Sequence, residues 1–190
     1  LGVIDVTDKA SMTTLSVTTY PNLAYCHYGW LDEARQYFYV NDEFDEMANP
    51  GLPTTTYVLD VTDLAHPQYV ASFTNGNGAI DHNPIGRDHY LFEANYRSGL
   101  RIYDVADLQN VQEVGYFDTY PADDQPEFNG AWGVHLMPSG SIIVSDIERG
   151  LFVFDASLVT AVGPWSPSGE TPVALRPAFP NPFRDHVRLG

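Results

Sequence analysis

Two histidines offer the clearest chemistry in this sequence. His27 and His82 lie at the same place in two expected inner strands of a repeated pattern, and Asp81 directly precedes His82. Imidazole nitrogens bind transition metals and exchange protons near neutral pH, so His27, His82 and an acid such as Asp42 could bind a metal or act as acid and base. The alternative is structural, with each histidine capping its own strand through a hydrogen bond that recurs with the repeat.

A run of acids at 42–46 is a second candidate site, with Asp42, Glu43, Asp45 and Glu46 close together in the chain. Calcium takes roughly six to eight oxygen ligands in a flexible arrangement, and carboxylates are its preferred side-chain ligands. The run lacks the alternating aspartates and the glycine of an EF-hand loop. We therefore expect either a Ca²⁺ site or a solvated insertion loop at 43–53 with exposed charge.

The composition excludes several classes of function. The 190 residues include 9 basic and 25 acidic side chains, for a formal net charge of −16. So few cations cannot follow a phosphate backbone, which excludes nucleic-acid binding, and the acidity favours a soluble extracellular protein. The single cysteine, Cys26, excludes a disulfide framework, and its apolar neighbours predict a buried side chain. A Gly-x-Ser-x-Gly nucleophile motif and an apolar run long enough for a transmembrane segment are both absent from the sequence.

Four copies of one pattern position these candidates. In each copy an apolar strand runs into an aspartate and then a turn, which the aspartate can close by accepting backbone N–H groups. The aspartates are separated by 55, 44 and 51 residues, and one four-stranded propeller blade takes roughly 40–50 residues. They are Asp5, Asp60, Asp104 and Asp155.

The strands around each copy predict an all-β fold. Inner strands are expected at 24–27, 78–82 and 130–135, with hairpin turns at 97–99 and 148–150. Counting strands gives two outer strands of one blade, then two complete blades, then a blade of three strands. The prediction is a partial β-propeller of about three to four blades of four-stranded antiparallel sheet, whose missing blades come from upstream sequence or another chain.

Three segments follow from this count. Residues 1–162 form the propeller blades and 163–174, rich in Pro, Ser and Gly, form a linker. Residues 175–190, which include a Pro-Asn-Pro-Phe stretch, begin a second β module.

Inner strands line the central channel of a propeller, so residues near their starts should converge at one rim. The rim candidates are His27, Asp81, His82, Trp132 and His135. A second aligned set precedes the middle hairpins and either bonds turn N–H groups or forms a ring of polar side chains around the channel. These residues are Asp42, Asn95 and Asp146.

Several of these stretches resemble a known family. Residues 25–30, 79–83, 94–102 and 144–151 are similar to the choice-of-anchor B family of LVIVD-repeat proteins, and the resemblance covers about residues 1–160. It implies a secreted bacterial β-propeller followed by an anchoring or sorting domain. Residues 179–183 resemble the start of the C-terminal sorting domain of the type IX secretion system. The resemblance therefore implies a place outside the cell, on its surface, or in the periplasm or outer membrane, but no established chemistry.

Three functions remain open from the sequence. The first is a non-enzymatic module that binds or assembles with a protein or a glycan at the cell surface, using aromatic side chains on the blade rims. The second is a metal-dependent hydrolase with a site at the channel mouth. The third is a structural subunit of a larger envelope complex. The rim aromatics expected to make contacts are Tyr28, Trp30, Tyr96, Tyr120 and Trp165.

Overall fold

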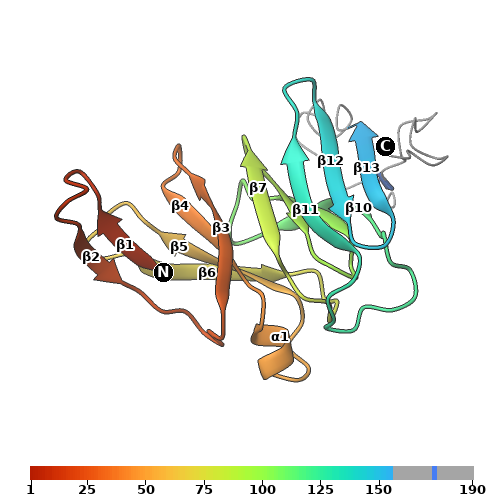
Figure 1. The fold of residues 1–190 in the computed structure, drawn as a ribbon, viewed down its shortest axis with the longest axis horizontal. Helices are drawn as coiled ribbons and strands as arrows, with labels where there is room; N and C mark the ends of the chain where they lie inside the picture. The colour runs from red at the N-terminus through yellow and green to blue at the C-terminus, as the bar shows by residue number, and fades with distance from the viewer. Residues whose placement is uncertain (156–172, 175–190) are drawn as a thin grey trace.

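The chain folds into four consecutive β-sheets with one short helix (Figure 1), and this computed structural model describes residues 1–155 and 173–174. The first sheet pairs β1 (Gly2–Asp5) with β2 (Thr13–Val17). The second has the order β3 (Cys26–Asp32), β4 (Tyr37–Asp42), β5 (Thr55–Asp60) and β6 (Gln68–Thr74), with α1 (Asp45–Ala48) between β4 and β5. The third has β7 (Asn83–Arg87), β8 (Tyr90–Ala94), β9 (Leu100–Asp104) and β10 (Gln112–Phe117). The fourth has β11 (Ala131–Leu136), β12 (Ser141–Asp146) and β13 (Gly150–Asp155).

This arrangement confirms the predicted partial all-β propeller. Two outer strands, two four-stranded meanders and one three-stranded sheet follow one another along the chain, and strands that are consecutive within each pair antiparallel. The first strands of the three larger sheets, β3, β7 and β11, lie side by side and run in the same direction (Figure 1). The starts of these inner strands therefore meet at one end of the molecule.

The second, third and fourth sheets pack face to face. Tyr39 and Val58 of the second sheet pack against Leu91 and Tyr103 of the third. Large apolar side chains are buried between the third and fourth sheets. They include Phe92, Leu100, Ile102, Ile142, Val144 and Phe154. Alternating side chains of a strand point to opposite faces, so β4, β5, β8 and β9, which are covered on both sides, are buried along almost their whole length.

The repeated aspartates close turns as the sequence predicts. Oδ1 of Asp5, Asp60 and Asp104 accepts the backbone N–H two residues later at 2.8, 2.9 and 2.9 Å. The aspartate three residues farther along each copy makes the same bond at 2.9 to 3.0 Å. The period is therefore a structural one, set by a turn that each blade needs.

The first two inner strands begin later than predicted. Residues 78–82 lead into β7, which contains both Pro84 and Gly86. Pro84 is tolerated because β7 is the inner edge of its sheet and pairs only with β8. At Gly86, a Cβ would lie 2.3 Å from Nε1 of Trp30, so the glycine lets the indole of β3 pack onto β7.

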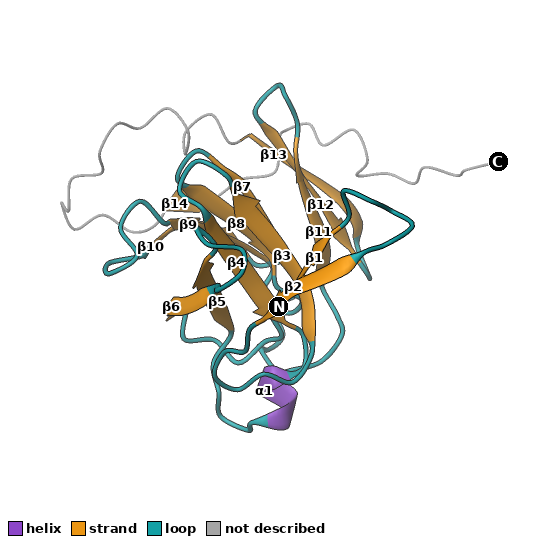
Figure 2. Ribbon diagram, turned by 90° about the vertical axis from the view of Figure 1, so that its left-hand side faces the viewer, coloured by secondary structure: helices purple, strands orange, loops and turns teal. Residues whose placement is uncertain are grey.

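Two burial predictions were wrong. Cys26 is exposed, because it begins β3, which is likewise an inner edge strand covered mainly on one side. The acidic run is not a solvated loop: Asp42 and Asp45 are fully buried, and Glu43 and Glu46 nearly so. The connection turns back as α1, which lies at the end of the sheets where the inner strands begin (Figure 2).

The predicted second module, 175–190, and most of the predicted linker lie outside the described residues. Two linker residues form β14 (Val173–Ala174), which pairs parallel with β10. In the part of the chain that the structure describes, no helix has the length and apolar character needed to cross a bilayer.

Candidate functional site

The inner-strand starts bring His27 and His82 together. Their rings stack with centroids 4.4 Å apart and planes 15° apart. His27 lies at the start of β3 and His82 immediately before β7, so two neighbouring blades supply the pair. The side chain of His82 is 1% exposed, whereas that of His27 is 29% exposed and reaches solvent.

Glu43 bridges the two imidazoles. Its Oε2 lies 3.3 Å from Nδ1 of His27 and its Oε1 lies 3.4 Å from Nε2 of His82. The hydroxyl of Tyr96 donates to Oε1 at 2.7 Å. Glu43 was expected in a calcium loop. It is instead the acid of the histidine pair, in the role that the sequence suggested for Asp42.

Tyr96 occupies an unusual backbone conformation, with φ of 37°. Its carbonyl accepts the N–H of Ala131 at 2.9 Å, and the same two residues form a bridge between the third and fourth sheets. A left-handed conformation costs a tyrosine roughly 1–2 kcal/mol. The surrounding contacts hold it there, with its hydroxyl directed at Glu43.

The backbone sets the orientation of His82. Nδ1 lies 2.6 Å from the carbonyl oxygen of Trp132, which can only accept, so Nδ1 carries a hydrogen. Burial lowers the pKa of His82, which favours a neutral ring with a lone pair on Nε2. That lone pair faces a carboxylate, and a proton or a cation between Nε2 and Glu43 would stabilise the arrangement.

Exposed aromatic side chains surround this polar centre. Tyr25 stacks on Phe44 at 4.8 Å, and Phe128 packs edge-on against Tyr96 at 5.3 Å and Phe44 at 6.2 Å. The ring of Trp132 lies 6.2 Å from that of His82 and is among the most exposed large side chains, at 55%. We call the exposed aromatic set the aromatic rim; its members are Tyr25, Tyr28, Phe44, Phe128 and Trp132.

The remaining predicted residues divide between other roles. Oxygens of Asp42 accept the backbone N–H groups of Ala24 and Tyr25 and the hydroxyl of Tyr20, so this carboxylate holds the approach to β3. Asp45 and Glu46 join Asp81 in a second, separate group of acids. His135 lies farther along β11 and contributes to neither group of potential metal ligands found among residues 1–155 and 173–174.

The aligned polar set is structural in two different ways. Asp146 accepts the N–H groups of Glu148 and Arg149 at 3.0 and 2.7 Å, as predicted for a turn aspartate. Asn95 instead accepts the N–H of His82 at 3.2 Å, and Asp42 bonds the approach to β3. In the two complete blades this position thus supports the inner strand that carries a histidine.

The expected rim aromatics are distributed differently from the prediction. Tyr28 is exposed, but Trp30 packs in the core between the second and third sheets and Tyr96 is buried. Tyr120 lies under the guanidinium of Arg97, and Trp165 is outside the described residues. Phe44 and Phe128 were missed because they lie in connections that share no repeat pattern.

Comparisons with known proteins leave the family open. No protein-family model matches the chain, and no curated protein matches it. One of the solved structures that it resembles is the crystal structure of the computationally designed Ika8 protein, at 9% sequence identity and a TM-score of 0.42. The match covers 64% of this chain and 30% of the designed protein, so the chain spans less than a third of that protein's length.

Proposed function

We propose that the protein is a non-enzymatic binding module that recognises a neutral glycan at the aromatic rim. The observation that carries this proposal is the placement of exposed aromatic side chains around the His27–Glu43–His82 centre. Aromatic faces pack on the apolar faces of sugar rings, while the carboxylate and imidazoles hydrogen-bond to hydroxyls.

The charged centre favours a glycan over a protein partner. The buried cores of protein interfaces are depleted of charged residues, with polar groups confined to the edge. In this protein a charged side chain lies at the centre and the aromatic side chains surround it. The central residue is Glu43, which is 8% exposed. The net charge of −16 disfavours an acidic polysaccharide and so favours a neutral one.

The proposal places the protein outside the cell, on its surface or in the periplasm or outer membrane of a bacterium. The resemblance to secreted LVIVD-repeat proteins and the acidic composition support this location. A glycan at the cell surface would be the natural ligand there.

Binding to neutral oligosaccharides of glucose, xylose and N-acetylglucosamine tests the proposal by isothermal titration calorimetry. Trp132→Ala and Tyr28→Ala should each weaken binding roughly 10-fold or more, because each removes a stacking surface. Tyr69→Ala is the matched control, since Tyr69 is an exposed tyrosine on β6 outside the aromatic rim. No binding to any of the three sugars, or equal losses in Tyr69→Ala and the rim variants, would refute the glycan proposal.

A second candidate function is a metal-dependent hydrolase at the same centre. Ligand atoms of His27, Glu43 and His82 lie within 4.8 Å of one another. Their 3.3 and 3.4 Å separations are close to the distance of about 3.3 Å between two ligands of tetrahedral zinc. Two histidines and a glutamate leave one position open in catalytic zinc sites, and the carbonyl that orients His82 supplies the outer support such sites use.

Zinc titration of chelator-treated protein tests the second candidate. One zinc ion per chain should bind, and Glu43→Gln or His27→Ala should weaken binding at least 10-fold, because each removes a ligand. His135→Ala, at an exposed histidine of β11, should bind zinc like the wild type. Protein that binds no zinc while keeping its fold would eliminate the hydrolase.

A further inference from the structure

Behind the aromatic rim lies a second, fully internal group of acids. Asp45 and Glu46 belong to α1, and Asp81 lies in the segment that leads into β7. One carboxylate oxygen from each lies within 4.8 Å of the others. Asp45 and Asp81 are 0% exposed and Glu46 is 2% exposed.

Part of each aspartate is held by the protein. The hydroxyl of Tyr57 donates to Oδ2 of Asp45 at 2.6 Å. Oδ2 of Asp81 accepts from Nδ2 of Asn41 at 2.7 Å and from the N–H of Asp42 at 3.1 Å. These bonds fix the two carboxylates from outside the group.

Within the described part of the chain, the remaining oxygens accept no hydrogen bond. They are Oδ1 of Asp45, Oδ1 of Asp81 and both carboxylate oxygens of Glu46. None of the ion pairs among the described residues reaches these three acids. A buried, charged carboxylate without a partner costs several kcal/mol, so these three acids must either take up protons or be neutralised by a bound cation.

The pKa values of the three acids are all raised, so each carboxylate is costly to keep charged at this position. Burial raises the pKa of Glu46 to about 11, with the charge of Asp81 adding to the effect. Burial also raises the pKa of Asp81 and of Asp45. The protein alone does not stabilise three negative charges at this point.

We propose that Asp45, Glu46 and Asp81 bind a structural Ca²⁺ ion. The unpaired atoms are all oxygens, which calcium prefers and zinc and copper do not. Calcium accepts irregular geometry and several waters, whereas Mg²⁺ demands a near-ideal octahedron. With Ca–O distances of roughly 2.3–2.6 Å, ligand oxygens up to about 5 Å apart can share one ion.

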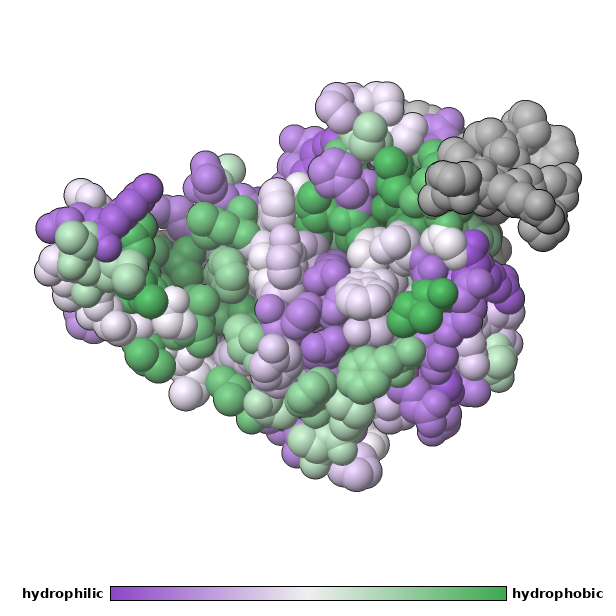
Figure 3. All heavy atoms as spheres, viewed as in Figure 1, coloured by the Kyte–Doolittle hydropathy of each residue, from purple (hydrophilic) through white to green (hydrophobic). Residues whose placement is uncertain are grey.

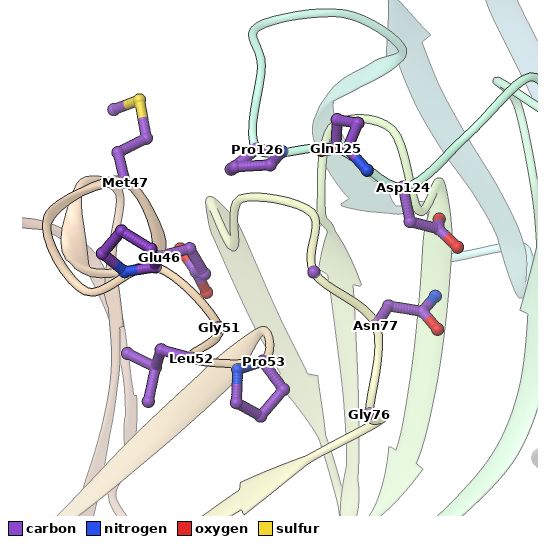
Figure 4. A pocket seen from close by; sticks show the side chains of 12 residues that line it. Glu46, Met47, Gly51, Leu52, Pro53, Gly76, Asn77, Asp124, Gln125 and Pro126 are labelled. Atoms are coloured by element: carbon purple, nitrogen blue, oxygen red, sulfur yellow. The ribbon is translucent and has the colours of Figure 1, made fainter.

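A pocket lies beside this group, and of the three acids only Glu46 lines it. Glu46 lines a cavity of about 390 Å³ between residues 46–53 on one side and residues 76–78 and 124–126 on the other. Figure 4 shows the Glu46 carboxylate directed into the space between these segments. An ion bound beside Glu46 would border this pocket, and waters in the pocket would complete its coordination.

The ion would also tie two blades together at the aromatic rim. Asp45 follows Glu43 by two residues, and Asp81 directly precedes His82. A cation held between α1 and the start of β7 would therefore fix the spacing of the His27–Glu43–His82 centre. The calcium site itself does not depend on the function proposed for that centre.

Calorimetric titration of EGTA-treated full chain with CaCl₂ tests the proposal. One ion per chain should bind, and a calcium excess of about 100-fold over Kd should raise Tm by roughly 5–10 °C. MgCl₂ should give a clearly smaller rise. Glu46→Gln and Asp81→Asn should each lose at least 10-fold in calcium affinity, while Asp124→Asn, on the same pocket, should bind like the wild type.

The calcium-free state gives a second readout. Without calcium, Glu46→Gln should melt at a higher temperature than the wild type, because it removes a buried carboxyl group that must take up a proton to stay neutral in the folded state. With calcium, the order should reverse. Absence of calcium binding, a Tm unchanged by EGTA, an equal Tm rise with magnesium, or unaltered calcium affinity in Glu46→Gln would each overturn the proposal.

Discussion

Several acidic side chains are buried in this fold. Acids occupy the ends of β4 and β8 and the α1 connection, where apolar side chains would normally complete a blade core. Some are satisfied by the protein, as Asp42 is by backbone N–H groups, and others converge without partners. The acids are evident in the sequence, but which of them the protein hydrogen-bonds is not. That depends on which carboxylate oxygen a donor from a neighbouring blade can reach.

Glu93 on β8 should make the stability of the protein depend on pH. Thr56 and Asn95 donate to its two oxygens, yet burial raises its pKa from 4.5 to about 7. The folded state therefore binds this proton more tightly than the unfolded state, so its contribution to stability is present below pH 4.5 and is lost as pH rises through 7.

Urea unfolding of wild type and Glu93→Gln between pH 5 and 7 measures this contribution. The wild-type free energy of unfolding should include a fall of up to about 1.4 kcal/mol per pH unit from this group, and the variant should lack it. Identical pH slopes in the two proteins would contradict the assignment to Glu93.

The strands and turns agree with the sequence prediction where the preferences of a few neighbouring residues determine them. The turn aspartates, the strand count of each blade and the hairpins at 97–99 and 148–150 were predictable, since aspartate and glycine preferences act within a few residues. The start of β7 and the α1 turn were not. Gly86 resembles a turn residue in the sequence, and only the indole of Trp30 from the neighbouring sheet explains it.

Two equivalent hairpin glycines allow the packing around the hairpins to be tested. Gly99 and Gly150 end matching hairpins with φ of 79° and 81°. A Cβ at Gly99 would lie 2.2 Å from the carbonyl oxygen of Phe117, whereas a Cβ at Gly150 would meet no atom of the described residues within 4 Å.

Gly150→Ala should cost roughly 1–2 kcal/mol through backbone strain alone. Gly99→Ala should cost clearly more, about 3 kcal/mol or above, because backbone atoms must also move. Chemical denaturation of both variants measures the difference. Equal losses would show that the approach of Phe117 to the hairpin is looser than described.

The whole molecule is a row of sheets with its functional groups at one end. Residues from the second, third and fourth sheets meet at the aromatic rim, so no single repeat contains the site. Sequence alignment of the repeats brought His27 and His82 together, but Glu43, Phe44 and Phe128 come from connections that differ between blades. Their contribution depends on how the sheets stack, which the repeat pattern does not specify.

The first sheet has a different surface. Ile4, Val6, Leu15 and Val17 of β1, β2 and their connection are exposed, and apolar side chains gather over this part of the molecule (Figure 3). An apolar face of this kind is typical of a contact surface. The prediction that another subunit or further blades complete the propeller remains a prediction.

In the proposed function, residues from three blades form one ligand site at the aromatic rim. An NMR titration with the tightest-binding neutral oligosaccharide tests it most directly, by following the indole N–H of Trp132 and the imidazole of His27. Both signals should shift saturably with one shared Kd, since a single ligand would contact both blades. Binding that leaves both signals unmoved, or that shifts them with different Kd values, would contradict the account.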